Sequence, residues 1–229
     1  MKHGLVLNKV VLLGRTLDEY RRYFALDLEM LRGRSILDVA SGVSSFTAEA
    51  RRLGLDVMAC DPIYELPGED IRHRCGPDLD QVVNAVRDLK TYNWHFYESP
   101  ERLRGFRERA YQTFLEDYAM RRGVRYVAGR LPELPFADGQ FDLTLVSYLL
   151  FVYEDQLGYE FHRRSVLELM RVTRGEARVY PTVTFEAVPW IHLARLQEDP
   201  ELRYLGFEVV RTEFEFLRNS NCFLRIFRR

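Results

Sequence analysis

The chain has 229 residues, of which 47% are hydrophobic and 29% are charged, and its net charge at pH 7 is −1. This balance is typical of a single globular domain and excludes a disordered or fibrous chain. The near-neutral charge provides no overall positive field for nucleic acid, and the longest apolar stretch, residues 143–153, is too short to cross a bilayer.

The first elements alternate between strand and helix. A short apolar run predicts a buried parallel strand over residues 34–39. A helix follows, and Ser44 is placed to cap its beginning and Gly54 to end it. A second apolar run predicts another strand over residues 57–60.

Residues 66–122 break this alternation, because the segment is long, charged and rich in aromatic residues. Residues 78–90 and 100–122 both look helical, and the aromatic segment 92–97 lies between them. A structureless loop of this length is improbable inside a compact domain. The sequence therefore predicts an inserted helical subdomain.

The alternation then resumes, and the chain closes with two strands joined by the turn-like residues 218–221, which indicate a hairpin. Repeated βα units predict a doubly wound α/β fold with a mainly parallel sheet, and the hairpin adds an antiparallel edge. The strands are expected at 124–128, 141–147, 177–180, 207–216 and 222–227, and the helices at 159–172 and 189–197.

Three strand ends carry residues suited to a ligand, which in such folds binds beyond the carboxyl ends of the strands. The turn from Asp38 to Ser44 is rich in small residues and leads into a helix N-terminus, which favours a carboxylate. Asp61 can accept hydrogen bonds from a ribose diol. Gly129 begins a Pro-rich loop that could form one wall of an adenine slot. Each of the three segments also has a purely structural alternative. The first could be a tight strand–helix turn, Asp61 could be a turn-forming residue, and the loop after Gly129 could serve only for packing.

Together, the stretches ILDVASGVSSF, VMACDP and LPELPFADGQFDLTLVS resemble the class I S-adenosylmethionine-dependent methyltransferases. The resemblance covers nearly the whole chain apart from the insert, and residues 14–24 extend it to uncharacterised bacterial members of the superfamily. It implies one methyltransferase-like domain over residues 1–229 with a seven-stranded sheet and S-adenosylmethionine as cofactor. We expect the insert, residues 66–122, to form a lid and much of the acceptor pocket.

The resemblance also implies which residues surround the cofactor. These are Asp38, Ala40 and Gly42 at its methionine part, Asp61 at the ribose, Pro62, Ile63, Gly129, Arg130 and Leu131 at the adenine, Ser147 and Tyr148 at the methyl donor, Arg15 at the carboxylate and Tyr20 at the sulfonium.

The chain departs from the family pattern at two places. The family loop usually reads D-x-G-x-G-x-G, whereas this chain has Ala40 and Ser44 at two of the glycine positions. A positive φ at Ala40 would be strained. Many relatives also place an aspartate after the glycine of the third motif, but here the residue is Arg130, which has no acceptor for the adenine amino group.

Methyl transfer from a sulfonium is an in-line displacement that depends on alignment and exclusion of water. A general base is needed only if the acceptor must lose a proton. The candidates near the fourth strand end are Tyr153, Glu154, Asp155 and, less directly, His162. The alternative for His162 is a structural role on a helix face. Three aromatic residues of the insert could stack on an acceptor or surround the cation, and the alternative is that they form the core of the insert. They are Trp94, Tyr97 and Tyr111.

Three other functions compete with a small-molecule methyltransferase. A nicotinamide-dependent oxidoreductase needs G-x-G-x-x-G, of which only Gly42 is present. A noncatalytic S-adenosylmethionine-binding protein and an RNA methyltransferase remain open, although the net charge disfavours RNA. The cysteines lack disulfide or metal-ligand spacing, so we expect a cytoplasmic protein without a metal.

Overall fold

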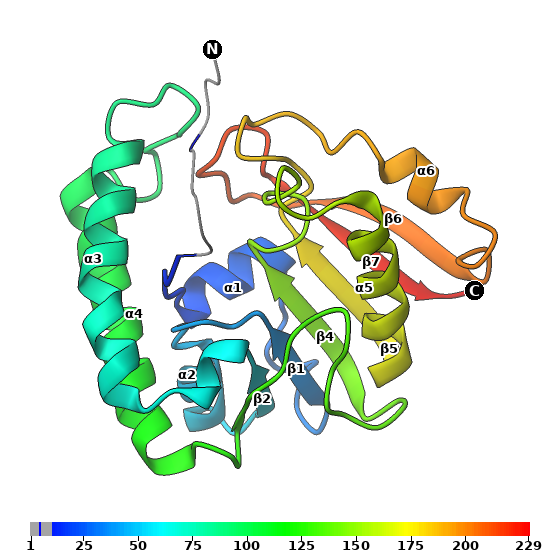
Figure 1. Ribbon diagram of the computed structural model, residues 1–229, viewed down its shortest axis with the longest axis horizontal. Helices are drawn as coiled ribbons and strands as arrows, with labels where there is room; N and C mark the ends of the chain where they lie inside the picture. The colour runs from blue at the N-terminus through cyan, green and yellow to red at the C-terminus, as the bar shows by residue number, and fades with distance from the viewer. Residues whose placement is uncertain (1–4, 6–10) are drawn as a thin grey trace.

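The computed structural model describes Leu5 and residues 11–229 of the chain. Within this described part, seven strands form one sheet in the order β3-β2-β1-β4-β5-β7-β6 (Figure 1). The strands are β1 (Ser35–Val39), β2 (Asp56–Cys60), β3 (Tyr126–Val127), β4 (Phe141–Ser147), β5 (Thr173–Tyr180), β6 (Leu205–Arg211) and β7 (Cys222–Arg228). The helices are α1 (Leu17–Phe24), α2 (Phe46–Arg52), the 3₁₀ helix η1 (Pro62–Glu65), α3 (Gly68–Val86), α4 (Pro100–Arg121), α5 (Tyr159–Val172) and α6 (Leu193–Gln197).

Strand pairing confirms the expected fold class. The pairs β1–β2, β1–β4, β2–β3 and β4–β5 are parallel. At the other edge, β7 lies between β5 and β6 and is antiparallel to both. The chain runs outward from β1 to β2 and β3 and then returns to β4 on the opposite side of β1. The strand order therefore reverses beside β1, and such a switch point leaves a crevice at the carboxyl ends of the strands.

The two faces of the sheet are buried under different helices. Ile36 packs in the same cluster as residues of α1 and α2, whereas the next residue, Leu37, packs with residues of α5 and α6. Both side chains are fully buried, because successive residues of a strand point to opposite faces and both faces are covered. This arrangement explains why β1 and β2 are largely apolar runs rather than alternating patterns.

The insert consists of α3 and α4, which lie side by side at the β3 edge of the sheet (Figure 1). The predicted start of the first helix at residue 78 is wrong, since α3 begins at Gly68 and continues through Pro77. A proline inside a helix costs about 3 kcal/mol. The helix persists because Ile71, Cys75 and Leu79 are buried at helical spacing on both sides of that proline.

Several other boundaries differ from the prediction. β5 begins at Thr173, four residues early, because Thr173 pairs with the first residue of β4. β3 is limited to Tyr126–Val127, and α6 begins only at Leu193. β6 ends at Arg211, so residues 212–221 connect the hairpin rather than the shorter turn that was expected.

Candidate functional site

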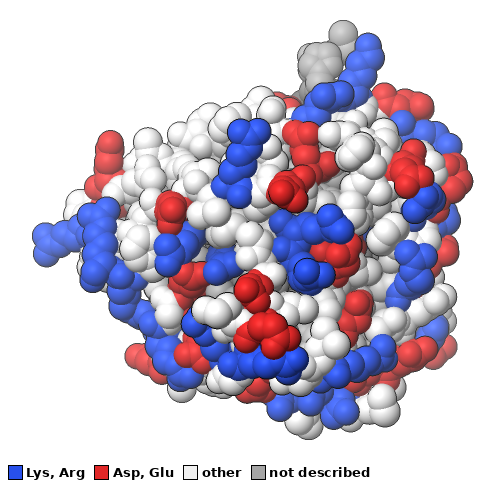
Figure 2. All heavy atoms as spheres, turned by 180° about the vertical axis from the view of Figure 1, so that it is seen from behind, with Lys and Arg blue, Asp and Glu red and all other residues white. Residues whose placement is uncertain are grey.

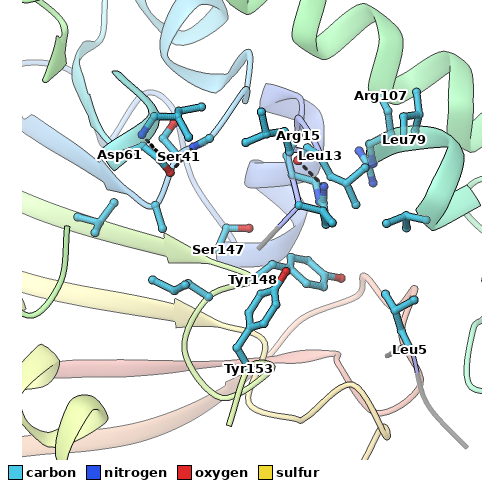
Figure 3. Close-up of a pocket in the computed structure, with 18 of the residues that line it drawn as sticks. Leu5, Leu13, Arg15, Ser41, Asp61, Leu79, Arg107, Ser147, Tyr148 and Tyr153 are labelled. Atoms are coloured by element: carbon cyan, nitrogen blue, oxygen red, sulfur yellow. Dashed lines mark hydrogen bonds between the residues drawn. The ribbon is translucent and has the colours of Figure 1, made fainter. Parts of the chain in front are cut away.

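A cavity of about 340 Å³ lies where the carboxyl ends of the central strands meet the insert (Figure 3). Its walls come from the loops after β1, β2 and β4, from residues 11–15 before α1, and from α3. It brings together every predicted site residue except Asp38 and His162. The predicted residues that line it are Arg15, Tyr20, Ala40, Gly42, Asp61, Pro62, Ile63, Gly129, Arg130, Leu131, Ser147, Tyr148 and Tyr153.

The loop after β1 has a strained backbone. Ala40 adopts a φ of 56° and Gly42 a φ of 54°. The left-handed region costs a residue with a Cβ about 1–2 kcal/mol, so the strain expected at Ala40 is present. The Ala40 N–H donates to the carbonyl of Cys60 at 2.8 Å, which holds the turn against the end of β2. Strain of this kind persists mainly where a ligand site or a switch requires it.

Ser44 contributes to the start of α2, although the N-cap itself is Ser45. The Ser44 hydroxyl oxygen accepts from the Phe46 N–H at 3.1 Å and donates to the carbonyl of Arg15 at 2.8 Å. The Ser45 N–H donates to the same carbonyl at 2.9 Å. The Ser44 side chain therefore provides the capping acceptor from the position before the N-cap, and both serines fasten the segment before α1 to this loop.

Asp61 forms the turn after β2 and also faces the cavity. One carboxylate oxygen accepts from the Gly42 N–H and the other from the Ile63 N–H, each at 2.9 Å. Burial raises the pKa of this carboxyl to about 6, and the two backbone hydrogen bonds partly oppose the rise. Each oxygen retains a lone pair for a further donor. The turn role and a ligand role are thus compatible in one side chain.

Asp38 stands behind the cavity wall rather than in it. It is fully buried and accepts from the Tyr20 hydroxyl at 2.9 Å and from the Ser41 hydroxyl at 2.6 Å. Burial raises the pKa of Asp38 to about 7, although these two hydrogen bonds lower it. The Tyr20 ring is stacked on Phe46 with centroids 4.3 Å apart. Asp38 therefore acts on the cavity by positioning Tyr20 and Ser41.

Two buried polar atoms of the cavity wall have no protein partner. The Arg15 guanidinium donates from Nη1 to the carbonyl of Leu13 at 2.6 Å and lies 4.6 Å from the Tyr148 ring centroid, but its Nε is buried and unpaired. The Ser147 hydroxyl at the end of β4 is also buried and unpaired. Since buried polar groups are nearly always hydrogen-bonded, these two atoms are available to a ligand in the cavity.

Gly129 allows the third loop to pack closely. A Cβ at this position would lie 2.6 Å from Pro135 Cδ and 2.9 Å from Cys60 Sγ, so no larger residue fits without displacement. The next residues, Arg130 and Leu131, also line the cavity, and the Arg130 side chain is solvent-exposed. The exposed guanidinium can reach water and does not impose an unpaired buried charge on this wall.

Tyr153 lines the cavity as predicted, but its protonation state does not suit a base. Burial raises the pKa of Tyr153 to about 12, so the phenol remains protonated near neutral pH. Burial also raises the pKa of Tyr148, whose backbone adopts a φ of 54°. Both phenols therefore keep their protons near neutral pH and can donate a hydrogen bond.

His162 lies outside the cavity, which removes the geometric basis for a catalytic role. Its ring is fully buried between Phe151 and Trp190, with centroids 5.7 and 4.7 Å away. Nε2 accepts from the Phe151 N–H at 3.2 Å, and Nδ1 is 2.9 Å from the Gly158 carbonyl oxygen. Burial lowers the pKa of this imidazole. The neutral ring thus has both nitrogens occupied by packing contacts.

The insert contributes to the cavity mainly through α3, whose lining residues sequence reasoning did not single out. They are Arg74, Leu79, Val82, Val83 and Val86, and α4 adds Leu103 and Arg107. Of the aromatic segment 92–97, Tyr92 lines the cavity, while Trp94 packs against Phe216. The spacing of residues 79, 82, 83 and 86 marks a helix face, but sequence alone did not show what that face covers.

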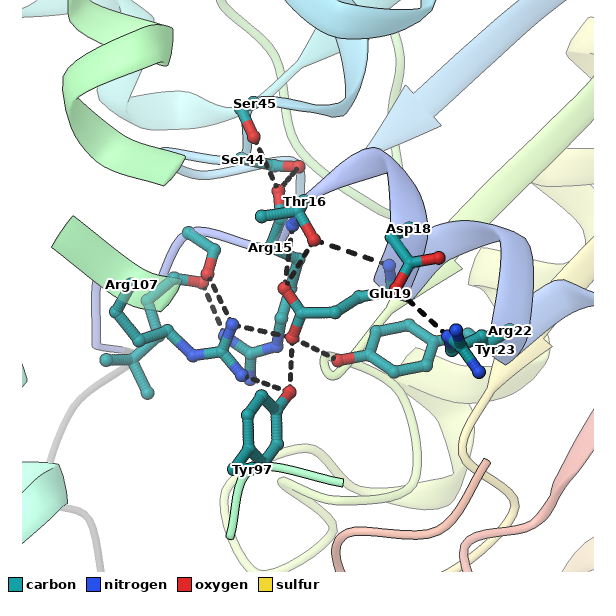
Figure 4. Close-up of polar contacts among 12 residues, drawn as sticks. Arg15, Thr16, Asp18, Glu19, Arg22, Tyr23, Ser44, Ser45, Tyr97 and Arg107 are labelled. Carbon is teal, nitrogen blue, oxygen red and sulfur yellow. Dashed lines mark hydrogen bonds and ion pairs between the residues drawn. The ribbon is translucent and has the colours of Figure 1, made fainter. Parts of the chain in front are cut away.

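A buried ion pair joins the insert to α1 (Figure 4). Arg107 Nη1 of α4 lies 2.6 Å from Glu19 Oε1 of α1, and both side chains are almost inaccessible to solvent. Tyr97 accepts from Arg107 Nη2 at 2.7 Å and donates to Glu19, to which Tyr23 donates at 3.0 Å. Burial raises the pKa of Glu19, but Arg107, Arg15 and the hydrogen bonds together bring it down to about 2. The carboxylate is therefore held ionised.

The outer surface carries both signs of charge. On the face shown in Figure 2, basic and acidic side chains are interspersed, without a large area of one sign.

Leu5 and residues 11–229 contain no helix with the length and hydrophobicity needed to cross a membrane.

The sheet order and the antiparallel C-terminal hairpin define the fold, which matches the class I methyltransferase fold. The chain belongs to the same protein family as the uncharacterized protein MJ0045 of Methanocaldococcus jannaschii. The two are 35% identical over 224 residues, which are 97% of this chain and 98% of that protein. Because this relative is archaeal, the expected membership of a bacterial branch is not confirmed.

More distant similarities involve methyltransferases. The demethylmenaquinone methyltransferase of Paenarthrobacter aurescens is 24% identical over 175 residues, which are 76% of this chain and 47% of that protein. No family model matches the chain.

Among solved structures, the magnesium protoporphyrin IX methyltransferase of Synechocystis, with bound S-adenosylmethionine, has a TM-score of 0.49 at 14% identity, covering 93% of this chain and 78% of that one. A TehB-like methyltransferase of Corynebacterium glutamicum has a TM-score of 0.46 at 17% identity, covering 86% and 81%. At this level of similarity, neither structure identifies the acceptor of this chain.

Proposed function

We propose that this protein is an S-adenosylmethionine-dependent methyltransferase that acts on a small-molecule acceptor by in-line displacement. The observation that carries the proposal is a row of unfilled hydrogen-bonding positions on one cavity. Arg15 Nε and Ser147 Oγ are buried without partners, and Asp61 has spare lone pairs. A ligand with a carboxylate at one end and a ribose diol at the other would satisfy these groups.

The residues present fit this cofactor. Asp61 would accept hydrogen bonds from the ribose hydroxyls, as a carboxylate after the second strand does in dinucleotide sites. The Arg15 guanidinium would pair with the carboxylate of the methionine part, because its Nε has no protein partner. Ser44 and Ser45 hold the Arg15 main chain through its carbonyl, and the Leu13 carbonyl and the Tyr148 ring hold the guanidinium. Residues 62–63 and 129–131 line the part of the cavity left for adenine.

Tyr20 and Tyr148 would lie near the sulfonium, whose positive charge aromatic faces stabilise. The bound cofactor would supply an electrophilic methyl group. Asp38 keeps Tyr20 in place, and the insert closes one side of the cavity, so the protein orients the reactants and limits water.

The side chains of the cavity do not favour a strong general base. The described residues that line it include no histidine, lysine, cysteine or glutamate. Tyr153 is protonated near neutral pH, and Asp61 is committed to two backbone N–H groups. We therefore propose an acceptor atom that is nucleophilic without deprotonation by the protein, with Tyr153 as a hydrogen-bond donor that positions it.

The competing proposals are a noncatalytic S-adenosylmethionine-binding protein and an RNA methyltransferase. Transfer of a labelled methyl group from S-adenosylmethionine to any acceptor would exclude the noncatalytic protein. The second is disfavoured by the net charge of −1 and by the mixed charges on the face in Figure 2.

The central test is ligand selectivity of the full chain. We expect isothermal titration calorimetry to detect S-adenosylhomocysteine binding, with a higher melting temperature, and to detect none with NAD. The physical reason is that the cavity offers one position for a carboxylate, at Arg15, and one for a ribose diol, at Asp61. Of the three glycines in the dinucleotide-binding motif, the chain has only Gly42. Binding of NAD without binding of S-adenosylhomocysteine would refute the proposed function.

A further inference from the structure

The cavity extends beyond the predicted cofactor residues into a region between the insert and the C-terminal part of the chain. In Figure 3 the labelled Leu79 and Leu5 mark this end, while Asp61 and Ser41 lie at the opposite end, with Ser147 and Tyr148 between them. Apolar and aromatic side chains form the walls here. They are Leu79, Val83, Val86, Tyr92, Leu103 and Phe216, which we call the apolar end.

The side chains of the apolar end are almost inaccessible to solvent and carry little polarity. Leu79 and Val83 are each 1% exposed. Arg107 is the charged residue among those that line this region, and its guanidinium is neutralised by Glu19 at 2.6 Å and donates to Gly14 and Tyr97. A phosphate, a sugar or a charged side chain placed here would lose its hydration without gaining partners.

We propose that the apolar end binds the methyl acceptor and that this acceptor is a neutral, apolar small molecule with an aromatic or aliphatic body. The inference rests on the proposed function, since it assumes that the cofactor occupies the end near Asp61. Tyr153 and Tyr148 lie between the two ends, where their hydroxyls can hold the single polar atom of such a molecule. A nucleotide or a polypeptide side chain carrying charge finds no matching group.

The test uses the full chain saturated with S-adenosylhomocysteine and two probes of equal ring size. Calorimetry at pH 7 compares 2-naphthol, which is neutral, with 2-naphthyl phosphate, which is charged. We expect at least tenfold tighter binding of 2-naphthol. Equal or tighter binding of the phosphate would overturn the proposal.

Variants then locate the bound probe. Val83→Phe fills the apolar end and should weaken 2-naphthol binding at least tenfold, while the dissociation constant of S-adenosylhomocysteine stays unchanged. The matched control is Ala85→Phe, which adds a ring to the exposed face of the same helix turn and should change neither constant. Should Val83→Phe not fold, Phe185→Trp adds bulk at a half-buried position of the wall and should give the same loss.

Two results distinguish a failure of this inference from a failure of the proposed function. If 2-naphthol binds equally to Val83→Phe, Phe185→Trp and the control, it occupies another place and the assignment of the apolar end is wrong. If S-adenosylhomocysteine does not bind but 2-naphthol does, and Val83→Phe abolishes it, the proposed function fails while the apolar character of the site stands.

Discussion

At the residue scale, Asp61 combines two roles in one carboxylate. Its oxygens fix the turns that follow β1 and β2 through Gly42 and Ile63, and their remaining lone pairs face the cavity. A substitution that removes both oxygens therefore disturbs the turns as well as a ligand. The informative variant is asparagine, which keeps the shape and one acceptor oxygen and removes the charge and the other acceptor.

We predict that Asp61→Asn weakens S-adenosylhomocysteine binding by about tenfold to a hundredfold, because hydrogen bonds to a charged group contribute about 1.5–3 kcal/mol. Calorimetry measures the dissociation constant. Asp56→Asn, at the exposed start of the same strand, is the control and should leave it unchanged. An unaltered constant in Asp61→Asn would reduce Asp61 to a turn residue.

The buried carboxylates also predict a pH dependence of binding. Burial raises the pKa of Asp61 to about 6 and that of Asp38 to about 7. Protonation of Asp61 removes an acceptor, so S-adenosylhomocysteine should bind about tenfold more weakly at pH 5 than at pH 8. Calorimetry across this range measures the effect, and Asp61→Asn should flatten the profile. A profile that stays steep in this variant would assign the dependence to Asp38 instead.

Stability of the ligand-free protein should change in the opposite direction for the same two groups. Their folded-state pKa values lie above the ordinary value of 3.8, so their ionisation opposes folding. The stability they contribute is complete below about pH 4 and is lost as the pH rises through 6 and 7.

At the scale of elements, the junction between α1 and α4 is polar although it is buried. Arg107 and Glu19 are 3% and 0% exposed, and Tyr97 and Tyr23 complete the hydrogen bonds around the carboxylate. Removing one partner leaves an uncompensated buried charge, whereas removing both does not.

We predict that Arg107→Met lowers the free energy of unfolding by about 3–5 kcal/mol, because it leaves the buried Glu19 carboxylate without the positive charge of Arg107. Urea denaturation at pH 7 measures the change, and the double variant Glu19→Gln with Arg107→Met should recover part of it. The exposed pair of Arg104 and Asp80 provides a control, since Asp80→Asn should cost at most about 1 kcal/mol. Equal losses in the single and double variants would contradict this explanation.

At the scale of the whole molecule, the insert and the segment before α1 enclose the cavity together. The Leu12 N–H donates to Asp78 of α3 at 2.9 Å, and Gly14 fits between the Val43 carbonyl oxygen and α4, where a Cβ would lie 2.4 Å from that oxygen. The lid expected over residues 66–122 therefore involves α3 and residues 11–15 as much as the aromatic segment.

We predict that S-adenosylhomocysteine slows amide hydrogen exchange in the loops 40–44 and 129–131 and also in residues 74–107 of the insert. The reason is that a ligand in the cavity stabilises every wall that it contacts. Exchange followed by mass spectrometry measures the protection, and α6, on the other face of the sheet, is the internal control. If the amides of the insert exchange identically with and without ligand, the prediction that the insert forms a lid is wrong.

Elements with a local sequence pattern could be predicted without the structure. β4 and α5 have the predicted bounds, because a mainly apolar segment after a turn and a helical spacing specify them without help from the rest of the chain. The residues at the carboxyl ends of the strands could also be predicted, since a doubly wound order places those ends together. The start of α3 ahead of Pro77 could not be predicted from local signals, because burial along the whole helix outweighs the local penalty of a proline.

Only the tertiary structure decided which side chains share a space. It placed His162 between two aromatic rings and turned α3 toward the cavity, and it paired Glu19 with Arg107 across 88 positions of sequence. Spacing along a helix identifies a buried face but not the surface that covers it, because that surface comes from a distant segment. The pKa values of Asp38, Asp61 and Tyr153 have the same origin, since burial that arises only on folding raises each of them.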